Sequence, residues 1–354
     1  MSIAILAVLA GTLITTNPAP EQAAQAAFDA VAGDFPSINA TVMVEGEIVW
    51  EAEGGVLRQA GNGPDQDYNV YSVAKMLTGM AYLSLAAEGA IDLDRPVRDI
   101  DPDLPEAFAP VTLRHLLTHT SGIRHYVSDQ DWIDFSNLRC DTPADAVAYF
   151  AGDQLTFDPG MRSRYSTFGF VLLSHLLVEL TGATSFDAAM TEVLGDVYLA
   201  RTDSVGADKA ENFHRDGEPA RAGDWYVLDD LSAECKFGGG GLLASSRDLA
   251  AMGQALTDGS VADISAEMEL LQPGQLPSGE AIGTVFGMTV GFSDSMQVHY
   301  ALHSGGSPGG RSFIIVLLEP QVSVAITANA DGEAFTDLAI RLARLFAGFP
   351  ETAD

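Results

Sequence analysis

The chain has few cationic side chains. Lys and Arg total 18 against 49 Asp and Glu, so the 354 residues carry a formal charge of −31. A surface of this sign repels nucleic acids and anionic lipid headgroups, and it favours solubility. The composition therefore argues against a nucleic-acid partner, while a basic partner is the minor alternative to simple solubility.

Cysteine is equally scarce, since Cys140 and Cys235 are the only two in the sequence. They lie far apart and neither belongs to a C-x-x-C pair, so their spacing indicates neither a disulfide framework nor a redox motif. We expect both to be structural, and the sequence leaves open whether they form a bridge.

Long apolar runs are absent except near the start, where residues 3–14 are apolar but too short to span a bilayer comfortably. This run resembles the core of a secretory signal, and residues 24–26 offer small side chains for cleavage, although no Lys or Arg precedes it. We predict that 1–20 is an apolar leader, that the protein is periplasmic or secreted, and that it has no integral membrane domain. A cytoplasmic location stays open.

The hydrophobic pattern places strands at the two ends of the chain and helices between them. Alternating apolar residues predict a hairpin over 40–53, and four more strands are expected within 286–330. An apolar helix is expected over 72–87. From about 92 to 284, helical segments alternate with loops that contain Gly, Pro and Asp.

These elements predict an α/β fold in which both ends of the chain share one antiparallel sheet, because hairpins connect its neighbouring strands. We predict a discontinuous domain over 21–350. Its α/β part, a sheet flanked by helices, would cover about 21–90 and 285–350, and an inserted, mainly helical part would cover about 91–284.

Two serines stand in patterns that are typical of hydrolase nucleophiles. The first, Ser307, lies in a G-x-S-x-G pattern with Gly305 and Gly309. This pattern marks a nucleophile elbow only between a strand and a helix, with a histidine later in the chain. Here a strand-like segment follows, and no histidine comes after His303. We interpret the segment as a glycine-rich bend between two strands.

The second is Ser72, which forms an S-x-x-K motif with Lys75 at the start of the apolar helix. Residues three apart share a helix face, so hydroxyl and amine can meet. Burial among apolar side chains lowers the pKa of a lysine, and a neutral amine can take the proton of a serine hydroxyl. The helix N-terminus adds N–H groups and positive potential. The alternative is a lysine that reaches solvent from a core helix.

The S-x-x-K motif is one of five stretches that resemble the serine β-lactamase and penicillin-binding protein family. The resemblance is greatest to its class C-like, esterase and D-aminopeptidase branch, and it extends over nearly the whole chain. The stretches that carry it are Ser72-Val-Ala-Lys75, TLRHLLTHTSGI at 112–123, residues 159–182 with Tyr165-Ser166-Thr167, residues 238–256, and HSGG at 303–306.

This resemblance implies a β-lactamase/transpeptidase-like fold and a set of catalytic roles. Ser72 would attack a carbonyl and become acylated, while Lys75 and Tyr165 would share the general-base and general-acid work. A tyrosine hydroxyl suits this only if a neighbouring cation favours its phenolate or relays its proton. The backbone N–H groups of Ser72 and Gly306 would form the oxyanion hole.

The resemblance also implies substrate-binding residues. His303 would lie on an edge strand and face the pocket, with Ser304, Thr167 and Tyr126 as further contacts. His125 and Tyr126 follow a turn that the resemblance places near the pocket.

Two residues depart from the family pattern, because Thr167 stands where Asn is found and His303 where Lys is more usual. A hydroxyl cannot present both an amide donor and a carbonyl acceptor, and a neutral imidazole attracts a carboxylate less than an ammonium does. Both departures weaken the case for an efficient β-lactamase and favour an esterase or a peptidase acting on small D-amino-acid substrates. No Glu suited to deacylation stands out.

His115 and His119 are four residues apart, which is the spacing of a metal pair. No Glu follows His115 as in H-E-x-x-H and no third ligand stands out, so we expect a structural helix, no metal and no cofactor.

Other residues could approach a pocket, but packing or surface roles are expected for them. Lys236 is expected at the surface. Core or rim packing is expected for Trp132, Trp225 and Tyr226, with a place in a substrate cleft as the alternative.

The sequence thus predicts a serine hydrolase that works through an acyl-enzyme on Ser72, most simply a carboxylesterase-type or β-lactamase-related hydrolase of small esters or amides. A short-chain ester is the first expected substrate, with a β-lactam or a D-amino-acid amide as close rivals. The alternatives are an enzyme like a D-aminopeptidase or DD-peptidase, and a non-catalytic relative that binds β-lactam or peptidoglycan-like ligands. The sequence does not indicate an oligomeric state.

Overall fold

The computed structural model describes residues 19–57, 63–203, 208–214, 225–228, 233–262, 268–272, 274–332 and 335–349. The leader predicted over 1–20 lies outside the described residues, apart from its last two positions.

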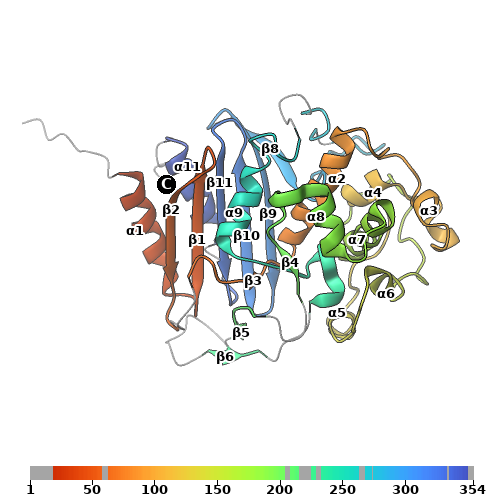
Figure 1. The fold of residues 1–354 in the computed structure, drawn as a ribbon, viewed down its shortest axis with the longest axis horizontal. Coiled ribbons are helices and arrows are strands. Elements are labelled where there is room, and N and C mark those ends of the chain that lie inside the picture. Colours follow the sequence, from red (N-terminus) through yellow and green to blue (C-terminus); the bar gives the residue numbers. More distant parts are fainter. Residues whose placement is uncertain are drawn as a thin grey trace, which may run out of the picture.

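One half of the molecule is built around a six-stranded antiparallel sheet with the order β2-β1-β11-β10-β9-β8 (Figure 1). The strand β1 from the start of the chain pairs with β11 from its end, so both termini build one sheet, and the predicted fold class is confirmed. The strands are β1 Ile38–Val44, β2 Glu47–Gly54, β8 Thr289–Ser293, β9 Val298–Ser307, β10 Gly310–Leu317 and β11 Val322–Ala328.

Alternate residues of the strands enter two separate cores, as the twofold side-chain period of a strand requires. On β10, Phe313 and Ile315 pack in one core, while Ile314 and Val316 pack in the other. Among the described residues, four helices cover the sheet: α1 Pro20–Ala32 and α11 Phe335–Phe346 lie on the first face, and α2 Val73–Ala87 and α9 Ser246–Gln254 on the second.

The helix α9 lies in the stretch that the sequence pattern assigned to the helical insertion, yet it packs on β1 and β11. Chain order alone does not show which face of the sheet a later helix returns to cover. The boundaries predicted at about 90 and 285 stay a prediction.

The other half of the molecule contains short helices around the long helix α7, whereas the small strands β3, β5 and β6 lie next to the main sheet (Figure 1). The helical elements are α3 Val97–Ile100, η1 Glu106–Phe108, α4 Leu113–Leu117, α5 Asp129–Ser136, α6 Pro143–Val147, α7 Thr167–Thr181, α8 Phe186–Leu194, η2 Gly195–Val197 and η3 Glu234–Gly239. The small sheets combine β3 Tyr68–Asn69, β7 Leu242–Ala244 and β4 Arg201–Thr202, and separately β5 Phe213–His214 and β6 Tyr226–Val227.

Helix α2 runs between the two halves and touches β9 and β10 as well as α7, α8 and η3. Its packing is close: a Cβ at Gly79 would meet the backbone oxygen of Phe286 at 1.7 Å, so no larger residue fits there. Because α2 is buried along most of its length, its N-terminal end has a defined position between the sheet and the helical half.

Within the described residues, no single helix is long and apolar enough to cross a membrane. Two helices bent by 67° relative to each other, Thr167–Thr181 and Phe186–Val197, reach that length and composition only as a pair.

Cys140 and Cys235 form a disulfide, which answers the question that their sequence spacing leaves open. The bridge joins the segment after α5 to η3, and Glu234 reinforces the same connection by accepting a hydrogen bond from the Cys140 N–H at 3.2 Å. The backbone of η3 is thereby attached to the helical half of the molecule.

Candidate active site

Ser72 immediately precedes the first residue of α2, at a sharp turn of the backbone. Tyr71, the residue before it, has φ of +46°, a left-handed conformation that is uncommon for any residue other than glycine. Ser72 itself already has helical backbone angles of −67° and −11°. The turn therefore presents the Ser72 side chain at the positive end of a buried helix.

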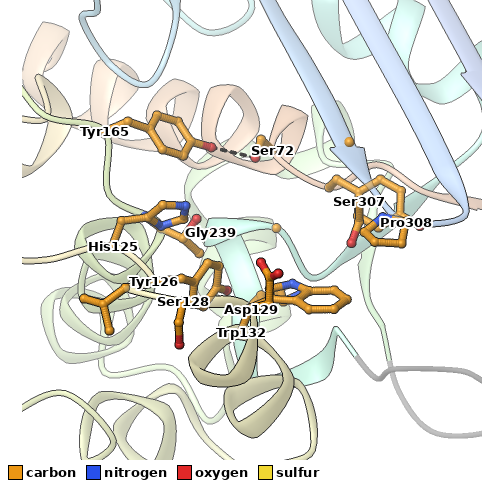
Figure 2. A pocket seen from close by; sticks show the side chains of 16 residues that line it. Ser72, His125, Tyr126, Ser128, Asp129, Trp132, Tyr165, Gly239, Ser307 and Pro308 are labelled. Atoms are coloured by element: carbon orange, nitrogen blue, oxygen red, sulfur yellow. Dashed lines mark hydrogen bonds between the residues drawn. The ribbon is translucent and has the colours of Figure 1, made fainter. Parts of the chain in front are cut away.

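The structure brings Ser72, Lys75 and Tyr165 together. The Lys75 Nζ donates to Ser72 Oγ at 3.2 Å, and the Tyr165 hydroxyl donates to the same oxygen at 2.6 Å (Figure 2). Lys75 also donates to the carbonyl oxygen of Gly239 on η3, and its Nζ lies 4.8 Å from the centre of the Tyr165 ring. Two segments far apart in the sequence thus meet at one hydroxyl, and η3 holds the amine through the Gly239 oxygen.

Lys75 is fully buried. Burial lowers the pKa of its amine to about 7, and no carboxylate among the described residues pairs with it. At neutral pH about half of this amine is therefore uncharged. A lysine in this state can accept a proton, which an exposed lysine at the same pH cannot do efficiently.

Tyr165 has the opposite tendency. Burial raises the pKa of its hydroxyl, and the hydrogen bonds to Ser72 and Thr167 oppose this rise. Tyr165 is 39% exposed to solvent, which reduces the rise in its pKa but does not reverse it. Its hydroxyl is a neutral donor at physiological pH, so the phenolate form that a tyrosine base would need is disfavoured.

Two histidines position the segment that carries Tyr165. The Nδ1 of His119 accepts a hydrogen bond from the Ser166 N–H at 3.3 Å, and the Nδ1 of His125 accepts one from the Thr167 N–H at 3.2 Å. Their rings lie 4.7 Å and 5.3 Å from the Tyr165 ring. Each histidine therefore contacts both the tyrosine ring and the backbone that follows it.

The histidines around the amine add no charge to the site. Burial, followed by the positive charge of Lys75, lowers the pKa of His125 to about 4 and that of His119 well below its usual value. The same two causes lower the pKa of His303. All three rings are neutral at pH 7, so Lys75 is the titrating group next to Ser72.

The convergent residues open onto a pocket of about 780 Å³. Its walls come from the start of α2, the loop 125–129, the start of α5, the start of α7, η3, and the connection between β9 and β10. Figure 2 shows Ser72 between Tyr165 on one side and Ser307 with Pro308 on the other. A cavity of this size accommodates a small organic substrate.

Three of the predicted substrate-binding residues, Thr167, Tyr126 and Gly306, line this pocket. Gly306 is brought there by its neighbour Gly305, where a Cβ would lie 2.2 Å from the Val70 oxygen and 3.1 Å from the Ser72 nitrogen. Only glycine permits this approach of β9 to the start of α2, and it places Gly306 beside the turn that carries Ser72.

The structure places His303 and Ser304 outside the set of residues that line this pocket, and the expectation that His303 lies on an edge strand is wrong, because β8 pairs with β9 on the far side from β10. In the register of β9 with β10, His303 lies opposite Ile314, on the face packed against α2, and Ser304 lies opposite Phe313, on the other face. Paired residues of neighbouring strands share a face. The positive charge of Lys75 contributes to the lowered pKa of His303. The Nδ1 of His303 hydrogen-bonds the Ser304 carbonyl oxygen at 2.6 Å.

Ser307 lies at the end of β9, and a turn through Pro308 and Gly309, with φ of +82° at the glycine, leads into β10. The prediction of a glycine-rich bend between two strands is therefore confirmed. Ser307 lines the pocket, but no lysine or histidine within the described ranges hydrogen-bonds its hydroxyl.

The prediction that Lys236 lies at the surface is wrong, because this lysine is only 7% exposed and lines the pocket. Its Nζ lies 5.4 Å from the centre of the Trp132 ring, and Trp132 lines the pocket as well. Trp225 packs beside the core of the sheet and Tyr226 is 60% exposed, so neither lines the pocket.

His115 and His119 do not face a common ligand position. Helix α4 ends at Leu117, before His119, and the Nδ1 of His115 accepts a hydrogen bond from the Thr112 N–H at 3.2 Å. Among the residues that the structure describes, no group of three or more His, Cys, Asp or Glu is arranged to hold a metal ion.

Sequence reasoning missed two residues of this site, His119 as a support of Tyr165 and Lys236 as a pocket cation. The only available signal for His119 was its place in the stretch 112–123 shared with the family, and no sequence pattern distinguishes a pocket lysine before a glycine run from an exposed one.

Comparisons with known proteins agree with this architecture. A family model described as Beta-lactamase matches residues 21–348. The chain is 25% identical over 382 residues to the serine beta-lactamase-like protein LACTB, mitochondrial, of Homo sapiens, over 80% of this chain and 69% of that protein. It is 30% identical over 194 residues to esterase EstB of Burkholderia gladioli, over 48% of each. A solved D-stereospecific amidohydrolase from Streptomyces sp. has 26% identity and a TM-score of 0.71, covering 90% of this chain and 97% of the other.

Proposed function

Because the chain belongs to the Beta-lactamase family, we propose that it is a serine hydrolase that works through an acyl-enzyme on Ser72. One observation carries this proposal: a buried amine, that of Lys75, and the hydroxyl of Tyr165 both lie within hydrogen-bond distance of Ser72 Oγ. A serine with a neutral amine and a neutral phenol at its oxygen has both a base and an acid available.

The two pKa shifts support separate roles for the two groups. The uncharged Lys75 amine takes the proton of Ser72 as its oxygen attacks the substrate carbonyl carbon, and the Tyr165 hydroxyl gives a proton to the departing oxygen or nitrogen. Water then attacks the acyl-enzyme, and the same groups remove its proton and return one to Ser72 Oγ. The N–H groups of Ser72 and Gly306 would bind the oxyanion, and one such donor is worth about 10²–10³ in rate.

Small esters are the substrates that we propose first. Thr167, which lines the pocket and hydrogen-bonds Tyr165, has a hydroxyl where amide recognition would use both a donor and an acceptor. The likeness to esterase EstB supports an ester, although it covers half of each chain. Amides of small D-amino acids are the second candidate, supported by the likeness to the D-stereospecific amidohydrolase along almost its whole length.

The test is to mix the protein with p-nitrophenyl butyrate and, separately, with a penicillin. We expect continuous release of p-nitrophenol and, after rapid acid quenching, an intact mass increased by one butyryl group on Ser72. A stable penicillin adduct without ester turnover would instead support the non-catalytic relative. Absence of both turnover and adduct would contradict the assignment of the site.

The pH dependence of kcat/KM for a neutral ester is a second expectation. Below pH 7 Lys75 is an ammonium and cannot accept the Ser72 proton, so we expect kcat/KM to rise with pH through an apparent pKa of about 7. The rate should fall only in strong alkali, because burial raises the pKa of Tyr165 above its ordinary value. A profile that declines between pH 6 and 8, after correction for spontaneous hydrolysis, would contradict Lys75 as the base.

A further inference from the structure

Lys236 is a nearly buried cation with no carboxylate partner among the described residues. It lies on η3, lines the same pocket as Ser72, and is 7% exposed. Its only charge-related contact among the described residues is the face of the Trp132 ring at 5.4 Å. Asp129, the carboxylate that lines this pocket, is exposed and forms no ion pair with it.

The other charges near Lys236 are already engaged. Asp203 attracts it weakly, but the Asp203 carboxylate is bound by Lys209 Nζ at 2.9 Å and by the Asn69 amide at 2.9 Å. Burial first, and then the charge of Lys75, lowers the pKa of Lys236 to about 8, so it remains mostly protonated at neutral pH. An uncompensated positive charge thus faces the substrate pocket.

The position of this lysine is well defined. The disulfide of Cys235 with Cys140 holds the preceding residue, and the Lys236 N–H donates to the Ala233 oxygen at 2.9 Å. Its Cδ lies 3.8 Å from where a Cβ of Gly240 would be, beside the backbone of Tyr71. The stem of the lysine and the turn that presents Ser72 therefore both lie beside Gly240.

A buried ammonium without a partner is unfavourable, and an incoming carboxylate would give it a charge-assisted hydrogen bond without displacing a protein carboxylate. A single lysine offers one charge and matches a carboxylate better than a dianionic phosphate. His303, in the position where the family more usually has a lysine, is neutral and does not line the pocket. The pocket therefore obtains its cation from η3 instead of from β9.

We propose that Lys236 binds a carboxylate of the substrate, so that this hydrolase prefers esters or amides that carry a carboxylate near the scissile bond. The inference rests on the proposed function, since it concerns the substrate of the same site.

The experiment compares matched esters that differ in one negative charge. Mono-p-nitrophenyl glutarate against p-nitrophenyl pentanoate places the charge on the acyl side, and 4-acetoxybenzoate against 4-acetoxybenzamide places it on the leaving group. We expect wild type to prefer the anionic member of at least one pair. Lys236→Met should reduce that anionic-to-neutral ratio of kcat/KM by about 10- to 100-fold, whereas Lys236→Arg, which keeps the charge, should retain most of the preference.

The outcomes separate this inference from the proposed function. If wild type hydrolyses the esters without preferring an anion, or if Lys236→Met keeps the ratio, the carboxylate site is overturned while the hydrolase stands. If wild type hydrolyses no ester and is not acylated, the proposed function fails. Using a ratio within one variant removes effects of partial unfolding, and the melting temperature of each variant checks its fold.

Discussion

Replacing Ser72 by Ala is expected to abolish turnover of p-nitrophenyl butyrate, lowering kcat by about 10⁴-fold or more. The substitution removes the oxygen that Lys75 and Tyr165 both contact, while the helix and the pocket around it keep their packing. No acyl adduct should form on the variant. The measurement is p-nitrophenol release together with intact mass after acid quenching.

The matched control is Ser307→Ala, because Ser307 lines the same pocket within a G-x-S-x-G pattern, yet no lysine or histidine in the part of the chain that the structure describes hydrogen-bonds its hydroxyl. This variant should still be acylated and should keep its rate within about tenfold, as expected for a change that leaves the nucleophile and its base in place. If Ser307→Ala loses the adduct while Ser72→Ala retains it, the nucleophile has been assigned to the wrong end of the chain.

Lys75→Met is expected to change activity and stability in opposite directions. Loss of the base should lower kcat by about 10²–10⁴-fold. The free energy of unfolding should rise, because the fall in the pKa of Lys75 from 10.5 to about 7 corresponds to roughly 4 kcal/mol of destabilisation at pH 7. Loss of the hydrogen bond to the Gly239 oxygen should lower the free energy of unfolding by about 1–3 kcal/mol. The expected net increase in the free energy of unfolding is therefore about 2 kcal/mol.

The sign of the pH dependence follows from the same shift. Between pH 7 and 10.5 the unfolded wild-type chain binds more protons at this lysine than the folded chain does, so wild-type stability rises with pH across this window. The difference in the free energy of unfolding between Lys75→Met and wild type should therefore be largest at or below pH 7 and should shrink as the pH approaches 10. Denaturant unfolding of both proteins at pH 7 and pH 9.5 measures it.

Lys209→Met provides the control for this stability change. It replaces another lysine by the same residue, but Lys209 is paired with the buried carboxylate of Asp203. Removing one partner of such a pair leaves an uncompensated charge and should destabilise the protein by about 3–5 kcal/mol. Equal effects of the two substitutions would show that the burial of Lys75 is not the cause.

The amino-acid sequence was sufficient for features that depend on neighbours along the chain. Ser72 and Lys75 are three residues apart on one helix, so their meeting needs only the helical period. The alternation of apolar residues predicts the strands, and the bend after β9 follows from its glycines and the strand on each side. Tyr165 could be named only through the resemblance to a family, because no local pattern connects it with Ser72.

Three-dimensional packing determined the direction of the side chains that complete the pocket. A shift of one position along β9 turns Ser304 to the opposite face from His303, and the register with β10 and the approach at Gly305 decide which residues reach Ser72. Lys236 is buried because a disulfide ties η3 to the segment after α5, while Gly238 and Gly239 allow η3 to approach α2 and α7 closely. Periodicity along a chain carries no information on which distant segment packs against it, so these contacts, and the lysine that they place in the pocket wall, appear only in the folded molecule.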